Sequence, residues 1–160
     1  MDTNCDQFVY VDHLLAEHRR LERLIHRTLA SIPTWEESDF VGWLPAMRSG
    51  LEAVRAELAQ HFKEEEAGGC VEEAIARCPG VSQEAQAVLQ EHGPILAELD
   101  RLIALCRRAQ PPTADEARQI EHDFRALVRR LRQHEAVEND IMQRAFAVSL
   151  ENGVEQPQDI

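Results

Sequence analysis

Histidine and glutamate recur in this chain at a spacing that could build a metal site. His61 and Glu65 are four residues apart, and so are His134 and Glu138. Residues four apart lie on one face of an α-helix, so each pair can present a nitrogen and an oxygen to one metal ion or to two neighbouring ions. Imidazole and carboxylate donors suit iron or manganese better than the thiolate sites that select zinc.

Two lone histidines precede these pairs. His18 comes 43 residues before His61, and His92 comes 42 residues before His134, so the two halves of the chain look like pseudo-repeats. Each half supplies one lone histidine and one His-x-x-x-Glu pair. The predicted metal ligands are therefore His18, His61, Glu65, His92, His134 and Glu138.

The apolar pattern places these six residues in the protein interior. His61 and Glu65 continue the series that contains Leu58, and His134 and Glu138 continue the series that contains Leu131. A buried imidazole without a partner loses its hydrogen bonds, and a buried carboxylate costs far more. A bound cation would remove both costs, so the pattern favours a di-metal centre inside a helical core.

Several residues of the same types are not predicted to be ligands. His13 and Glu17 have the four-residue spacing but fall off the apolar stripe of the first helix, whereas Glu22 lies on its flank. Glu22 and Cys70 are left open as additional ligands. The remaining histidines, His26 and His122, are expected in solvent. The acids next to the predicted ligands, Glu64, Glu66 and Glu135, are expected at the surface, with a position behind the ligands, where they would support them, as the alternative.

Four amphipathic helices account for the stripes. Apolar residues at spacings of three and four predict helices over residues 11–29, from about Trp43 to the Gly68-Gly69 pair, over 82–110 and from 113 onward, with a short extra helical turn over 70–77. Ser82 is predicted as an N-cap, and Thr113 with Glu116 as a capping box. No strand pattern competes, so the expected fold is an all-α, up-down-up-down antiparallel four-helix bundle.

The length and net charge of the chain argue against several other classes of protein. The 160 residues fit one domain, predicted as a tail over 1–9, the bundle over 10–148 and a flexible tail over 149–160. The formal net charge of -12 argues against nucleic acid as a partner, and no apolar run approaches a membrane span. The four cysteines form no CxxC pair, which favours reduced thiols, and we expect a cytoplasmic protein. The sequence identifies no protein partner.

The pattern resembles the hemerythrin-like (HHE cation-binding) domains over essentially the whole helical region. The matching segments are Glu17-His18-Arg19-Arg20-Leu21-Glu22, His61-Phe62-Lys63-Glu64-Glu65, Glu91-His92 and His134-Glu135-Ala136-Val137-Glu138-Asn139. The resemblance implies two non-haem iron ions with the four histidines as terminal ligands. It also implies that Glu65 and Glu138 bridge them beside an oxo or hydroxo group, with manganese or zinc as alternatives.

Two departures separate this chain from the oxygen carriers of that family. The carriers have a second histidine one turn along the third helix, where this chain has Val88 and Leu96 around His92. They also use an aspartate five residues after the last histidine, where this chain has Asn139. The four-His, two-Glu set looks more like the iron-centre repair proteins of the family.

We therefore expect a hemerythrin-like di-iron protein that binds or responds to oxygen, nitric oxide or peroxide. Two histidines per iron would leave room for a small ligand, so an open, symmetric centre fits redox chemistry or metal release better than storage. One alternative is an oxidoreductase or iron-handling protein that oxidises Fe(II), reduces peroxide or nitric oxide, or repairs iron centres. Another is a zinc-binding or purely structural module that binds another protein. The residues leave open whether the chain is an enzyme.

Overall fold

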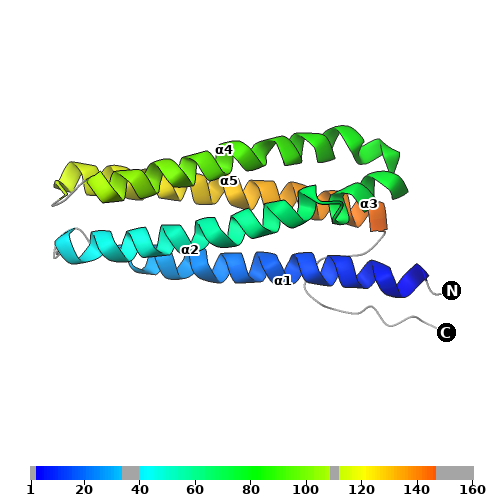
Figure 1. Cartoon of the computed structure of the whole chain (residues 1–160), viewed down its shortest axis with the longest axis horizontal. Helices are drawn as coiled ribbons and strands as arrows, with labels where there is room; N and C mark the ends of the chain where they lie inside the picture. Colours follow the sequence, from blue (N-terminus) through cyan, green and yellow to red (C-terminus); the bar gives the residue numbers. More distant parts are fainter. Residues whose placement is uncertain (1–2, 34–39, 109–111, 147–160) are drawn as a thin grey trace.

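The computed structural model describes residues 3–33, 40–108 and 112–146. Four long helices make up most of this part of the chain: α1 (Thr3–Ala30), α2 (Phe40–Glu66), α4 (Ser82–Arg108) and α5 (Ala114–Phe146). They run alternately in opposite directions along one axis (Figure 1). α2 packs against α1 and α4, and α5 packs against α4 and α1, which closes the ring. The predicted all-α antiparallel four-helix bundle is confirmed.

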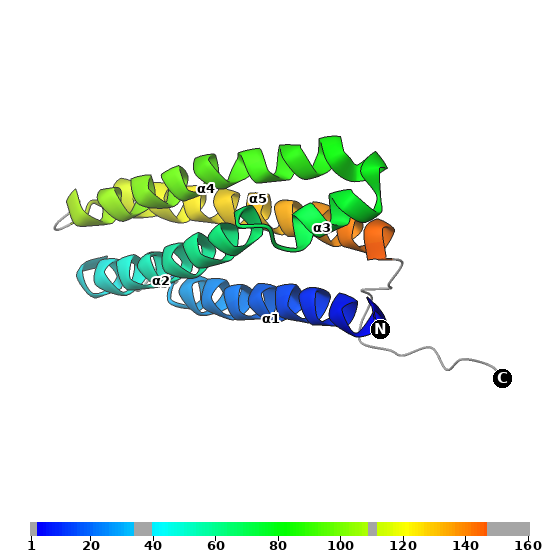
Figure 2. The same cartoon turned by 45° about the vertical axis from the view of Figure 1, so that its right-hand side comes forward.

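A short helix covers the end of the bundle at which α2 ends and α4 begins. α3 (Cys70–Arg77) and the 3-10 turn η1 (Pro79–Val81) fill the connection between those helices. Figure 2 shows α3 beyond the last turn of α2, next to the last turns of α5. Gly68 permits the sharp change of direction because its φ of 88° is a conformation that other residues rarely adopt. The extra helical turn predicted over 70–77 is thus a helix of its own.

The helix starts differ from those predicted. α1 begins at Thr3, so residues 3–9, expected to form a tail, are helical, and α2 begins at Phe40 rather than near Trp43. Ser82 does not cap α4 from outside, because η1 runs directly into the helix and gives Ser82 helical angles of φ −54° and ψ −44°. The tail predicted over 149–160 lies outside the described residues.

The capping box at the start of α5 is confirmed. The backbone N–H of Thr113 donates to Glu116 Oε2 at 2.8 Å, and the backbone N–H of Glu116 donates to Thr113 Oγ1 at 3.2 Å. These bonds satisfy two donors that a helix end leaves free. They fix where α5 begins, and therefore the position along the bundle axis of the residues further along α5.

Two apolar clusters fill the bundle and leave a polar layer between them. The larger contains Leu21, Leu58, Ile95 and Leu131, and lies toward the α1–α2 and α4–α5 connections. The smaller contains Leu14, Val88 and Ile141, together with residues of α3 and η1. Along α1, α4 and α5 the change from one cluster to the other falls at the predicted ligands, and α2 ends directly after its own predicted ligands. The fold therefore surrounds those residues with apolar side chains on both sides.

Candidate metal centre

All six predicted ligands are buried and meet in the polar layer. His18 comes from α1, His61 and Glu65 from α2, His92 from α4, and His134 and Glu138 from α5. Each is at most 7% exposed, and Glu138 is fully buried. The interior positions predicted from the apolar stripes are therefore those the structure has. Burial of four imidazoles and two carboxylates in one layer is costly unless a cation or hydrogen bonds compensate.

Each carboxylate lies between two histidines from different halves of the chain. Glu65 Oε1 is 3.5 Å from His61 Nε2, while its other oxygen, Oε2, is 3.2 Å from His92 Nε2. Likewise Glu138 Oε2 is 3.2 Å from His18 Nε2, while Oε1 is 2.8 Å from His134 Nε2. A carboxylate that directs one oxygen to each of two sites has the arrangement of a bridging ligand.

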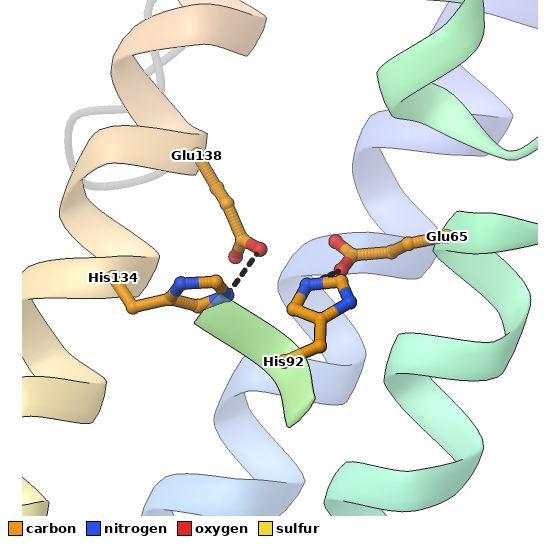
Figure 3. A group of neighbouring side chains, drawn as sticks. All are labelled: Glu65, His92, His134 and Glu138. Atoms are coloured by element: carbon orange, nitrogen blue, oxygen red, sulfur yellow. Dashed lines mark ion pairs between the residues drawn. The ribbon is translucent and has the colours of Figure 1, made fainter. Parts of the chain in front are cut away.

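The donor atoms gather into two overlapping groups. In the first, atoms of Glu65, His92, His134 and Glu138 all lie within 4.8 Å of one another (Figure 3). The second group, within the same limit, consists of His18, His61 and Glu138. Glu138 belongs to both. The donor atoms of the layer therefore form two overlapping groups that share Glu138, and each group could hold a metal ion.

These inward-facing atoms do not satisfy one another by hydrogen bonding. Among the described residues, the Nε2 atoms of all four histidines and both oxygens of Glu65 and Glu138 are buried without a hydrogen bond of acceptable geometry. His134 Nε2 and Glu138 Oε1 are only 2.8 Å apart, but the angles between them do not suit a hydrogen bond. Buried polar groups in folded proteins are nearly always paired. The residues fit metal ions, which would satisfy the nitrogen and oxygen lone pairs together.

The outer nitrogens of three histidines face acidic side chains. His61 Nδ1 is 3.0 Å from Glu17 Oε2, and His92 Nδ1 is 2.9 Å from Glu66 Oε1. His134 Nδ1 lies 3.4 Å from a carboxylate oxygen of Glu91. A carboxylate on the outer nitrogen fixes the ring orientation, leaves the other nitrogen free to bind a metal and makes it more basic.

Glu17 corrects the sequence prediction, which placed it off the interior stripe. It is only 4% exposed, because it faces the seam between α1 and α2. The expectation that Glu66 belongs to the surface is also incomplete, since this exposed residue bonds His92. One signal was available: an acid directly precedes each lone histidine, as Glu17 before His18 and Glu91 before His92.

The pKa values show how strongly the groups of this layer interact. Burial lowers the pKa of His61, but the hydrogen bond with Glu17 and the charges of Glu65 and Glu138 outweigh it and raise the pKa to about 9. Burial raises the pKa of Glu65. At Glu138 burial acts in the same direction, but His134 and His18 reverse it and hold the pKa well below the usual range. Protons thus occupy part of the layer in the absence of metal.

Neither of the two residues left open as additional ligands belongs to either group of donor atoms. Glu22 instead forms an ion pair with Arg132 across the α1 and α5 seam. Cys70 is buried, and burial together with the charge of Glu65 raises the pKa of its thiol to about 12, so the thiol is neutral. His26 and His122 are exposed, as expected.

Glu64 and Glu135 differ from the surface acids they were expected to be. Glu64 is partly buried, and its Oε2 lies 2.9 Å from His13 Nε2 at the edge of the interface between α1 and α2. Glu135 is also partly buried, and its Oε1 is shielded from solvent.

Among the described residues, no helix is both long and apolar enough to span a membrane.

Comparison with known proteins places this arrangement in a family. No curated protein and no solved structure matches the chain. The family model described as the hemerythrin HHE cation binding domain matches residues 9–146. That span contains all six inward-facing ligand residues and every helix of the bundle except the first turns of α1. The chain therefore belongs to the hemerythrin HHE cation-binding domain family.

Proposed function

We propose that this protein is a non-haem di-iron protein that binds or responds to oxygen, nitric oxide or peroxide. Four histidines would be terminal ligands and two glutamates would bridge the irons: His18, His61, His92, His134, Glu65 and Glu138. The observation that carries the proposal is the set of buried Nε2 and carboxylate atoms that converge without hydrogen bonds. Manganese and zinc are the alternatives that the same donors accept.

Iron, when bound in this layer, supplies redox chemistry and Lewis acidity toward small molecules. The chain's own residues supply the surroundings. Glu17 and Glu66 hold the rings of His61 and His92 through hydrogen bonds, and the apolar clusters on both sides limit access by water. Two histidines and two carboxylate oxygens per position leave coordination sites for a small ligand. This environment supports reaction or reversible binding of a diatomic molecule or peroxide.

The surroundings of His92 favour an open centre over the donor set of the oxygen carriers. Val88 is part of the smaller apolar cluster, and Leu96 packs against the larger one. Neither can replace the fifth histidine that those carriers have at this helix. This supports the second candidate function, an iron-handling or oxidoreductase role that includes repair of iron centres.

Metal analysis of the purified protein tests the proposal most directly. We expect about two irons per chain after aerobic purification, together with charge-transfer absorption in the near ultraviolet. A colourless protein that contains zinc, or whose stability does not change when metal is removed, would contradict the di-iron proposal and favour a structural or interaction module.

Replacing a bridging residue tests the assignment of ligands. Glu138→Ala removes both oxygens that link His18 to His134, so we expect the variant to bind at most one metal ion per chain. Glu22→Ala is the matched control, because Glu22 pairs with Arg132 outside the two donor groups and should leave two ions bound. Retention of two ions by Glu138→Ala would show that the bridge is assigned wrongly.

A further inference from the structure

The two halves of the metal centre correspond to each other residue by residue. α1 corresponds to α4 and α2 to α5, so that equivalent residues are His18 and His92, His61 and His134, Glu65 and Glu138, and Glu17 and Glu91. The contacts follow the same rule. Glu17 from α1 faces the outer nitrogen of His61 on α2, and Glu91 from α4 faces that of His134 on α5. The outer surroundings of the two halves can therefore be compared position by position.

The two halves differ at the position five residues after His61 and five residues after His134. In the first half this position is Glu66, whose Oε1 lies 2.9 Å from His92 Nδ1. In the second half it is Asn139, which by this correspondence is the residue expected to face the outer nitrogen of His18. His18 Nδ1 and Asn139 Oδ1 are both buried, and within the described part of the chain neither has a hydrogen-bond partner. His18 thus has an amide where His92 has a carboxylate.

A second difference lies one residue after the same histidines. Phe62 follows His61, and its ring stacks on His92 with centroids 3.8 Å apart and planes 3° from parallel. The equivalent residue is Glu135, which cannot stack as an aromatic ring does. Its Oε1 is buried without a hydrogen-bond partner among the described residues. The ring of His92 is therefore held by a stacked ring and by a carboxylate on its outer nitrogen, whereas for His18 the equivalent positions carry Glu135 in place of the ring and Asn139 in place of the carboxylate.

The donor atoms that face the interior also differ between the two metal positions. Four residues bring their donor atoms together around His92 and His134, namely these histidines with Glu65 and Glu138. Around His18 and His61 the group contains only Glu138 besides the two histidines. Glu65 approaches His61 at 3.5 Å but His92 at 3.2 Å. By its inward-facing donors the position at His92 and His134 is the better formed of the two, although the outer nitrogen of His134, like that of His18, has no hydrogen bond among the described residues.

We propose that the two metal positions differ in affinity, and that Asn139 is the positioning residue that sets much of the difference. The position of His92 and His134 fills first and holds its metal tightly, while the position of His18 and His61 fills second and exchanges its metal. A carboxylate on the outer nitrogen makes a histidine a stronger ligand, and an amide does so less. The proposal rests on the proposed function in one respect, namely that two metal ions bind in this layer.

Stepwise titration of the metal-free protein with Co²⁺ tests this proposal, with the visible absorption of bound Co²⁺ and calorimetry as readouts. In the unaltered chain we expect two steps, the first at least about tenfold tighter than the second. Asn139→Asp adds a charge without changing the size of the side chain, and we expect it to tighten the second step by about tenfold. Glu66→Gln removes a charge at the equivalent place and should weaken the first step by a similar factor.

Gln133→Glu is the control for the added charge, because Gln133 is an exposed residue of α5 and the substitution preserves its size. It should shift neither step. If Asn139→Asp fails to fold, Glu66→Gln alone decides which step depends on the outer acid. The proposal is overturned if Glu66→Gln weakens the second step, or if Gln133→Glu tightens binding as much as Asn139→Asp does. Two equal steps would overturn it and leave the di-metal function standing, whereas binding of fewer than two Co²⁺ would overturn both.

Discussion

At the scale of single residues, we expect the acids behind the predicted ligands to determine how well the histidines bind metal. Glu17 accepts a hydrogen bond from His61 Nδ1 at 3.0 Å and is buried beside it. We expect Glu17→Gln to weaken metal binding at the position of His61 by about 10- to 100-fold, because the neutral amide supports the ring less than a carboxylate.

The dissociation constants of the two bound metal ions, measured by titration, check this expectation. Glu57→Gln is the matched control, since Glu57 also lies on the α1 and α2 seam but pairs with Arg20 at the surface. An unchanged affinity in Glu17→Gln would mean that the hydrogen bond to His61 contributes only to the fold.

The six inward-facing residues could be predicted because each continues an apolar stripe on its own helix. Glu17 could not be predicted in this way. It lies next to His18 on α1 and is buried only because α2 packs against that side of the helix. Periodicity within one helix shows which face is apolar but not which flanking residues a neighbouring helix covers. The same reason explains why Glu66 and Glu135 were assigned to the surface.

At the scale of helices, α1 and α2 come into close contact at Thr28 and Gly50. A Cβ atom on Gly50 would lie 2.5 Å from Thr28 Oγ1, so the two helices approach more closely than a larger residue allows. Thr28 is buried, and its hydroxyl donates to Leu24 O within α1. The sequence showed a glycine inside a helix, but the contact that requires it depends on how the helices pair.

We expect Gly50→Ala to lower the free energy of unfolding by about 1 to 2 kcal/mol. Overpacking against Thr28 costs about 1 to 3 kcal/mol, and the better helix propensity of alanine returns about 0.5 to 1 kcal/mol. Urea denaturation of the metal-loaded protein measures the loss. In the background of Thr28→Ala the same substitution should cost less, because the nearest atoms are gone. Equal costs in both backgrounds would show that this contact does not limit helix approach.

At the scale of the whole molecule, a charged layer interrupts a core that is otherwise apolar. The bundle, the order of its helices and the depth of the ligands follow from four apolar stripes and short connections, which is why they could be predicted. The start of α1 at Thr3 could not be predicted, because the apolar stripe of that helix begins only at Val11. The fusion of η1 with α4 could not either, because Ser82 is a residue type that commonly caps a helix, although here it has helical angles. Stability of this fold is therefore linked to what occupies the layer, and metal and protons compete there.

That competition predicts different effects of pH on the stability of the metal-free and the metal-loaded protein. The pKa of His61 rises from 6.5 to about 9 on folding, and that of His134 rises as well. The folded metal-free protein then binds a proton that the unfolded chain has released. The stability that His61 contributes is fully present below pH 6.5 and is lost as the pH rises toward 9. We expect the free energy of unfolding to fall by about 1.4 kcal/mol per pH unit within that window.

Bound metal replaces the proton on His61 Nε2, so the metal-loaded protein should not show this fall. Chemical denaturation between pH 6 and about 9.5, with and without a chelator, compares the two forms. Glu17→Gln replaces the charged acceptor that raises the pKa of His61 with a neutral amide, so it should reduce the slope of the metal-free protein. His26→Asn, at an exposed histidine, should leave the slope unchanged. A metal-free protein whose stability is constant over this range would show that the layer is not protonated at His61.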